Sequence, residues 1–325
     1  MKIIRPVLQL LMAAAVAGGC AGAFAQADYP NRPVKIIVPF AAGGPADIYA
    51  RFIAQRLTTE LKQAFVVDDR PGAGSIIGTD AVAKAPADGY TLLMMSNTHT
   101  VNESLVPTKP FKLMDDFVGI APVNYSDLML VVHPSVPAKT LPELIALARS
   151  KPGKLNYASS GTGTPYHMAG ELFKYMAGVK ITHIPYKGSS GARTDVVGGQ
   201  VDMMFDAVTT MASMAKDGKV RGLATSGKTR NGITPDLPTV AEAGVPQYEA
   251  TIWLGFMAPK NTPPEIVNKL NAEIRKIVAL PDVKAAWAAQ GAVPLSMTVP
   301  EFQQYLKDDI AKWANIVKIS GAKPD

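Results

Sequence analysis

The sequence predicts an α/β fold with mostly parallel sheets, divided between two domains. Short apolar runs rich in β-branched residues alternate with segments of helical hydrophobic spacing, as in chains built from βαβ units. The chain has 325 residues, which is more than a single hydrophobic core usually serves. Two similar segments, each a strand, a glycine-rich loop and a helix, occur near residues 40 and 160. They suggest one comparable unit in each domain.

Residues 1–25 have the features of a secretory signal peptide. Lys2 and Arg5 precede a short apolar run, and Ala23-Phe24-Ala25 offers a small-residue cleavage site. A lipoprotein cleavage site at Cys20 is the alternative, although Ala17 stands where a bulky aliphatic residue is usual. We therefore expect export to the periplasm and a mature chain of 300 residues without a cysteine.

Composition and charge argue against several function classes. The whole chain carries a formal net charge of +6, but its basic residues are dispersed, so nucleic-acid binding is not expected. No apolar stretch after the leader approaches the roughly 20 residues that cross a bilayer. The histidines at 99, 133, 167 and 183 lack metal-binding spacing, and no nucleophile, base and orienting group occur together. We expect no metal, no cofactor and no enzymatic activity.

The stretch from Pro39 to Asp47 predicts an anion site. It follows an apolar strand at 34–38 and precedes a helix whose apolar residues recur between 48 and 61. Gly43-Gly44 allows a tight turn, and Pro45 suits the first helical position. Free backbone N–H groups at such a helix start favour an anion, although any loop between a strand and a helix looks similar.

Further along, residues 65–69 and 90–95 are predicted strands, with helical spacing from 76 to 82 between them. The polar cluster 96–100 follows the strand at 90–95 and so lies at the carboxyl end of that strand, where parallel sheets bind ligands. A solvated loop with capping residues explains this cluster equally well.

Two crossings between the domains are predicted near 124–128 and 248–254. Apolar runs at 117–123 and 128–132 flank polar residues that interrupt them, and 252–259 is a strand that returns. Other expected strands are 181–186, 201–205 and 221–226, with a loop at 187–191. The expected helices are 141–150, 192–197, 264–280, 281–290 and 300–320, the last with Phe302, Leu306, Ile310, Trp313 and Val317 packed on one side.

The second glycine-rich segment runs from Ser159 to His167, after a strand at 155–158. Thr164 is a suitable N-cap with Pro165 at the first helical position. Two such helix starts facing across a cleft would each offer partial positive charge, so a dicarboxylate could bridge them. His167 could donate to the anion, or it could cap and pack. Asp206, at the end of a strand, could accept from a ligand or cap the next segment.

Several motifs occur in a fixed order along the chain. They are Tyr29-Pro30-Asn31-Arg32-Pro33, Asp69-Arg70-Pro71-Gly72-Ala73-Gly74, Asp88-Gly89-Tyr90-Thr91-Leu92, Pro185-Tyr186-Lys187-Gly188 and Pro238-Thr239-Val240-Ala241-Glu242-Ala243-Gly244. Over essentially the whole mature chain, these motifs resemble the Bug-type periplasmic solute-binding proteins of tripartite tricarboxylate transporters. Pro45 and Ala46 stand where many relatives have Gly and Thr, so the solute stays open between aliphatic and aromatic dicarboxylates.

The resemblance implies a two-lobed, type II venus-flytrap fold with a cleft that captures a small carboxylate without changing it. We expect lobe 1 to contain residues 26–124 and 250–325, and lobe 2 to contain residues 125–249. The implied partners are the large and small integral membrane subunits of the transporter, and we expect the protein to be a monomer. A sensing role and a secreted α/β enzyme acting on carboxylic acids are the alternatives. The ligand contacts expected from this likeness and from the helix starts are Phe40, Ala41, Ala42, Gly43, Gly44, Asn97, Thr98, Ser159, Ser160, Gly161, Thr162, Thr164, His167 and Asp206.

Overall fold

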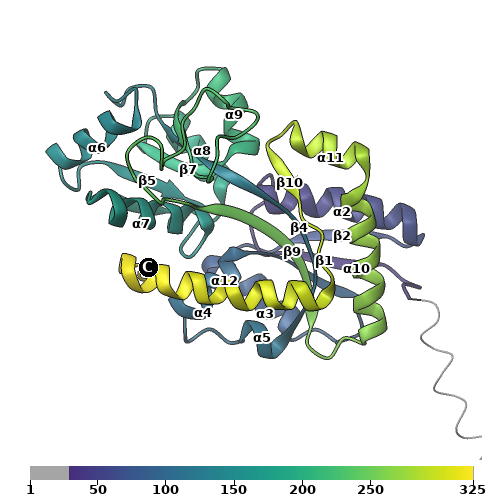
Figure 1. Ribbon diagram of the computed structural model, residues 1–325. Helices are drawn as coiled ribbons and strands as arrows, with labels where there is room; N and C mark the ends of the chain where they lie inside the picture. Colours follow the sequence, from purple (N-terminus) through teal and green to yellow (C-terminus); the bar gives the residue numbers. More distant parts are fainter. Residues whose placement is uncertain (1–28, 325) are drawn as a thin grey trace, which may run out of the picture.

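The computed structural model describes residues 29–324, in which ten strands form one curled sheet (Figure 1). The order is β2-β1-β3-β9-β4-β7-β5-β6, and β8 and β10 also pair with β4. The predicted signal peptide and Cys20 lie outside the described residues. The strands are β1 (Val34–Val38), β2 (Phe65–Asp69), β3 (Thr91–Ser96), β4 (Phe117–Val132), β5 (Asn156–Ser159), β6 (Thr182–Pro185), β7 (Met203–Ala207), β8 (Arg221–Thr225), β9 (Thr251–Pro259) and β10 (Ala292–Pro294).

The sheet has two parts that meet along β4. Residues 117–127 of β4 pair with β9, whereas residues 128–132 pair with β7 and β8. We call the part built on β1, β2, β3 and β9 lobe 1, and the part built on β5, β6, β7 and β8 lobe 2. Strands β1, β2 and β3 are mutually parallel in lobe 1, as are β5, β6 and β7 in lobe 2. The predicted α/β, two-lobed architecture is therefore present, while the exact lobe boundaries stay a prediction.

Helices cover both faces of each part of the sheet. In lobe 1, one face packs against α2, α10 and α11, and the other packs against α3, α5 and the first half of α12. In lobe 2, α6 and α7 cover one face, and α8 and α9 cover the other. The helices are α2 (Pro45–Leu61), α3 (Ile76–Ala83), α4 (Asn97–Leu105), α5 (Leu113–Asp116), α6 (Leu141–Ser150), α7 (Pro165–Ala177), α8 (Ser189–Val197), α9 (Val208–Lys216), α10 (Pro264–Ala279), α11 (Pro281–Ala288) and α12 (Val299–Ser320), with a 3₁₀ turn at Ala73–Ser75.

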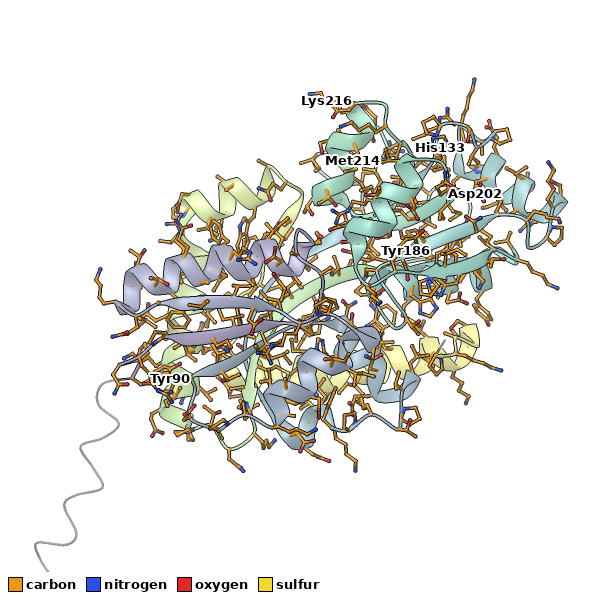
Figure 2. The ribbon with its side chains drawn as sticks, turned by 180° about the vertical axis from the view of Figure 1, so that it is seen from behind. Tyr90, His133, Tyr186, Asp202, Met214 and Lys216 are labelled. Carbon is orange, nitrogen blue, oxygen red and sulfur yellow. The ribbon has the colours of Figure 1, made fainter. Side chains whose placement is uncertain are left out.

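Helix α12 joins the two lobes. Phe302 and Leu306 are fully buried in the core of lobe 1, whereas Trp313 and Ile316 pack into the main core of lobe 2. Figure 1 shows this helix running below both parts of the sheet. In the view from behind, Tyr90 lies at the far end of lobe 1, His133 and Asp202 lie toward the far end of lobe 2, and Tyr186 lies between them (Figure 2).

Three predictions about the elements were wrong. Residues 124–127 do not interrupt β4, because Asn124 pairs with Leu254 and Asp127 pairs with Thr251 on β9. The polar cluster after β3 is the start of α4 rather than a loop, since Ser96 and His99 form a capping box. Helix α8 begins at Ser189, within the predicted loop. The helices α5 and α9 and the short strand β10 were not predicted at all.

Candidate ligand-binding site

Four helix starts meet at a small inner compartment between the lobes. It has a volume of about 30 Å³, which is room for a small group such as a carboxylate or a water molecule. Each of α2, α4, α7 and α8 presents its first turn or its cap there. Unsatisfied N–H groups and the helix dipole make such starts favourable for an anion. The inner compartment is lined by Phe40, Ala41, Gly44, Pro45, Ala46, Ser96, Thr98, Ser160, Pro165, Tyr166, Gly188, Ser189, Ile252 and Leu254.

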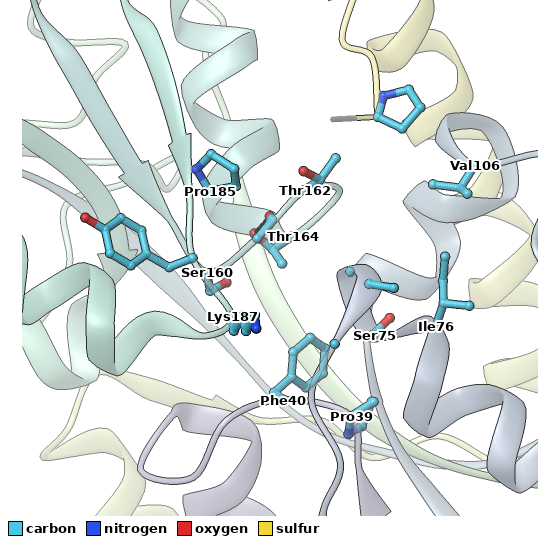
Figure 3. Close-up of a pocket in the computed structure, with 16 residues that line it drawn as sticks. Pro39, Phe40, Ser75, Ile76, Val106, Ser160, Thr162, Thr164, Pro185 and Lys187 are labelled. Carbon is cyan, nitrogen blue, oxygen red and sulfur yellow. Dashed lines mark hydrogen bonds between the residues drawn. The ribbon is translucent and has the colours of Figure 1, made fainter.

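A larger outer compartment of about 360 Å³ adjoins the inner one, because Phe40 and Ser160 line both. Three loops surround it, at 72–76 in lobe 1 and at 160–164 and 185–187 in lobe 2 (Figure 3). Most of its side chains are apolar or small. The two compartments together can hold a polar head and a larger organic body. The outer compartment is lined by Pro39, Phe40, Gly72, Ala73, Gly74, Ser75, Ile76, Val106, Ser160, Gly161, Thr162, Thr164, Pro185, Tyr186, Lys187 and Pro324.

The loop after β1 is held by Asp47 in the first turn of α2. The backbone N–H of Gly43, a residue with φ of +75°, donates to Asp47 Oδ2 at 2.8 Å. Arg51 then contacts Asp47 Oδ1 at 2.5 Å and Asp69 at 2.8 Å. The guanidinium offsets the negative charge of Asp47, so the start of α2 keeps its preference for an anionic ligand.

The loop after β5 is held by its own side chains. Ser159 Oγ accepts from the N–H of Gly161 at 3.1 Å and lies 2.7 Å from His183 Nε2. Thr164 Oγ1 donates to the carbonyl of Gly161 at 2.6 Å and caps α7, as predicted for this residue. The N–H of Gly163 donates to His167 Nδ1 at 3.1 Å. Bonds within the protein therefore hold the shape of the loop.

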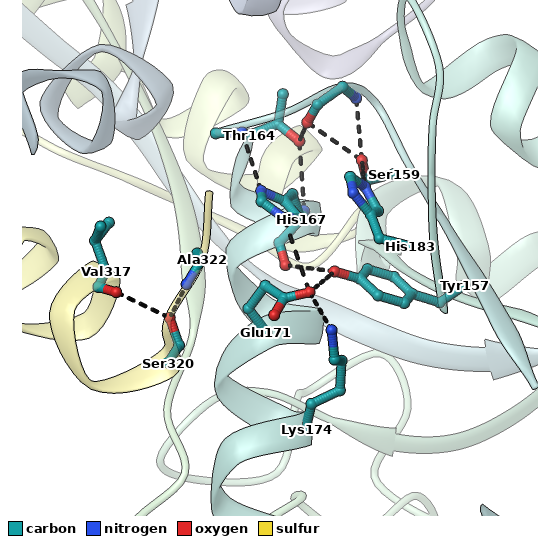
Figure 4. Close-up of polar contacts among 12 residues, drawn as sticks. Tyr157, Ser159, Thr164, His167, Glu171, Lys174, His183, Val317, Ser320 and Ala322 are labelled. Carbon is teal, nitrogen blue, oxygen red and sulfur yellow. Dashed lines mark hydrogen bonds and ion pairs between the residues drawn. The ribbon is translucent and has the colours of Figure 1, made fainter. Parts of the chain in front are cut away.

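A buried network supports this loop from below (Figure 4). The rings of His167 and His183 are stacked, with centroids 4.2 Å apart. Glu171 Oε1 accepts from Tyr157 Oη and from Lys174 Nζ, both at 2.6 Å, and lies 3.8 Å from His167 Nε2. His167 thus lies within a network under the loop and does not line either compartment.

Asp206 is fully buried at the end of β7 and is bonded within the protein. Arg193 Nε donates to Asp206 Oδ2 at 2.5 Å, and the N–H of Ala207 donates to Oδ1 at 2.7 Å. Burial raises the pKa of Asp206, while the Arg193 guanidinium opposes that shift. Arg193 also donates to Ser189 Oγ at 2.8 Å. Ser189 lines the inner compartment. Asp206 therefore holds Arg193 in place, and Arg193 in turn holds the hydroxyl of Ser189.

The predicted contacts fall into two groups. The residues that line a compartment are Phe40, Ala41, Gly44, Thr98, Ser160, Gly161, Thr162 and Thr164. The residues that line neither are Ala42, Gly43, Asn97, Ser159, His167 and Asp206. Asn97 Nδ2, for example, donates to the carbonyl of Thr251 at 2.9 Å, so its amide nitrogen is bonded within lobe 1. Whether any member of either group touches the solute stays a prediction.

Several lining residues were missed from the sequence, and three features among them matter most for the site. They are the loop 72–76, the segment 185–189 and Tyr166. A signal for the first exists, because Gly72-Ala73-Gly74 follows β2 as Gly43-Gly44 follows β1. Both loops leave the carboxyl ends of neighbouring parallel strands, which place them at the same edge of the sheet.

No helix within residues 29–324 is both long and apolar enough to span a membrane. In the same residues, no three histidine, cysteine, aspartate or glutamate side chains are grouped so as to hold a metal ion. The site described above is built from backbone groups, hydroxyls, apolar side chains and Lys187, whereas Asp47 and Asp206 are each paired with an arginine behind it.

Comparison with known proteins identifies relatives along nearly the whole chain. Residues 49–322 match the model of the tripartite tricarboxylate transporter family receptor. Protein BugT of Bordetella pertussis is 39% identical over 307 residues, which are 94% of each chain.

Two solved structures carry carboxylates. An R. palustris protein solved with adipate is 35% identical and has a TM-score of 0.89, with 92% of this chain and 100% of that chain covered. MatC from Rhodopseudomonas palustris, solved with bound malate, is 30% identical with a TM-score of 0.84, covering 89% and 100%. The predicted family and the periplasmic-binding-protein fold are confirmed.

Proposed function

Because the chain belongs to the receptor family of tripartite tricarboxylate transporters, we propose that it captures a small carboxylate between its two lobes. The observation that carries this proposal is the meeting of four helix starts at the inner compartment. A carboxylate there would accept from backbone N–H groups and from hydroxyls such as those of Thr98 and Ser189. It would need no buried cation to offset its charge, since the helix starts supply partial positive charge.

The relatives support the same ligand class. One was solved with adipate and another with malate, which share terminal carboxylates but differ in length and in hydroxylation. Family members are solute-binding proteins rather than enzymes. A protein of this class would release its solute unchanged.

The wider role that we propose is delivery of the solute to a membrane transporter. The protein would act in the periplasm after removal of the predicted leader, and its partners would be the large and small membrane subunits of a tripartite carrier. The family description supports this role. A sensing role would use the same binding site with another partner, and no feature of the site favours it over transport.

Thermal unfolding tests the proposed ligand class. The mature protein would be unfolded, freed of co-purified solute, refolded and heated with mono- and dicarboxylic acids, and with sugars and amines as controls. A ligand at about 100 times its Kd should add about 2.7 kcal/mol of stability, which raises Tm by several degrees. Recovery of the bound acid unchanged would separate a binding protein from an enzyme. Stabilisation by sugars or amines, with none by any carboxylate, would overturn the proposal.

A further inference from the structure

Ser75 presents a buried hydroxyl that has no hydrogen-bond partner within residues 29–324. The residue is 3% exposed, lines the outer compartment and is the cap residue of α3. A serine at this position normally caps the helix by accepting from the first turn. Here its φ of +78° places the backbone in the left-handed region, and the side chain makes no capping bond. Ser75 is thus available to a group inside the compartment.

The backbone around Ser75 is strained and held from behind. Ala73, with φ of +46°, is a second non-glycine residue in the left-handed region. Thr79 Oγ1 donates to the carbonyl of Ser75 at 2.8 Å, and His99 Nε2 lies 2.9 Å from the same Thr79 oxygen. Strained residues persist only where the surroundings fix them, and they gather at ligand clamps. This support therefore points to a binding role for the turn at 73–75.

A cation lines the same compartment from lobe 2. Lys187 carries the only charged side chain among the described residues that line it, and it forms no ion pair or side-chain hydrogen bond in the described part of the chain. Figure 3 shows its amine between Ser160 and Phe40, with Ser75 on the other side of Phe40. Apolar groups, among them Ile76 and Val106, make up much of the remaining wall.

We propose that the outer compartment is a second acidic-group subsite, with Ser75 and Lys187 binding the distal carboxylate of a dicarboxylate. This inference rests on the proposed function, which places the first carboxylate in the inner compartment. The apolar wall selects an apolar spacer between the two acids, such as a methylene chain. The ammonium of Lys187 supplies charge and the hydroxyl of Ser75 supplies a fixed donor, so the site prefers diacids to monoacids.

Matched acids test the subsite directly. Isothermal titration calorimetry would compare succinate with butyrate, adipate with hexanoate, and suberate with octanoate, since each pair differs by one carboxylate. The wild-type protein should bind at least one diacid about tenfold or more tightly than its monoacid, as expected for one charge-assisted contact. Lys187→Met should remove most of that preference, because the diacid loses its charge-assisted contact. Ser75→Ala should reduce the preference by a smaller factor.

Lys180→Met is the matched control, because Lys180 is an exposed lysine of lobe 2 that does not line the compartment. It should keep the wild-type preference, and unchanged Tm values would show that all variants are folded. Equal affinity for both acids of every pair, or a preference that survives Lys187→Met, would overturn the second subsite and leave the proposed function intact. If no acid of either kind binds, the proposed function fails and the second subsite fails with it.

Discussion

At the scale of single residues, His99 contacts both the end of β3 and residues behind the binding site. Its ring is fully buried, and Nδ1 lies 3.2 Å from the backbone nitrogen of Ser96 and 3.0 Å from the Ser96 carbonyl oxygen. Nε2 lies 2.9 Å from Thr79 Oγ1, and this hydroxyl donates to the carbonyl of Ser75. The edge of the ring also contacts Phe40, with ring centroids 6.1 Å apart.

This arrangement predicts a loss of stability in mild acid. Burial lowers the pKa of His99 to about 4, from an ordinary value of 6.5. Well above pH 6.5 the ring is neutral in both states. Between pH 6.5 and pH 4 the unfolded chain binds the proton first, so the free energy of unfolding falls, by about 2 kcal/mol at pH 5. Urea unfolding at pH 7 and pH 5 measures this loss.

Two histidine variants separate this effect from the titration of other groups. His99→Gln should be less stable at pH 7 but should lose about 2 kcal/mol less than the wild type on going to pH 5. His133→Gln, which changes a histidine bonded to Ser135 away from the site, should keep the wild-type loss. An unchanged pH dependence in His99→Gln would show that this ring does not limit stability in acid.

At the scale of elements, local hydrophobic spacing was enough to predict most helices and strands. It failed for α4 because the buried face of that helix is largely polar, with Asn97, Thr98, Thr100 and Asn102 among its buried residues. It failed for β4 because the partners of Asn124 and Asp127 come from β9, far away in the sequence. In both cases tertiary pairing supplies what the local pattern lacks.

The same reason explains which parts of the site were predictable. The loops after β1 and β5 were identified from their glycines and the helix starts that follow. The loop 72–76 and the segment 185–189 join them only because β2 lies beside β1 and β6 lies beside β5. Strand order is a property of the folded sheet, so Ser75 and Lys187 were not recognised as lining residues from the sequence.

The loop after β5 should tolerate little change at Gly161. Its φ is +123°, and an added Cβ would lie 2.9 Å from the carbonyl oxygen of Tyr186. Gly161→Ala therefore shifts the loop against β6, at a cost of about 1–3 kcal/mol that appears as weaker carboxylate binding. Gly153→Ala is the control, since that glycine also has positive φ, +74°, but has no atom within 4 Å of the added Cβ. Calorimetric Kd values equal in the two variants would contradict the proposed role of the loop.

At the scale of the whole molecule, the two lobes touch beside the inner compartment. Ser190 Oγ at the start of α8 donates to the carbonyl of Ala42 at 3.0 Å, which joins lobe 2 to the loop after β1. Gly188 lies against Ala41 so closely that a Cβ at Gly188 would overlap the Cβ of Ala41. A ligand that bridges the lobes would favour the arrangement in which these contacts form, because it gains contacts on both sides.

Gly188→Ala should therefore impair closure without unfolding either lobe. The extra methyl group separates the loop after β1 from α8, so the affinity for carboxylates should fall about tenfold or more, which is a loss of at least 1.4 kcal/mol. Small-angle X-ray scattering should show a smaller radius of gyration for the wild type with saturating ligand than for Gly188→Ala. Gly232→Ala, where the added Cβ meets no atom within 4 Å, should match the wild type. If Gly188→Ala binds carboxylates and contracts like the wild type, the contact between Gly188 and Ala41 does not control closure. The lobes must then be held together elsewhere. Helix α12 would be the next element to test, because it packs in the cores of both lobes.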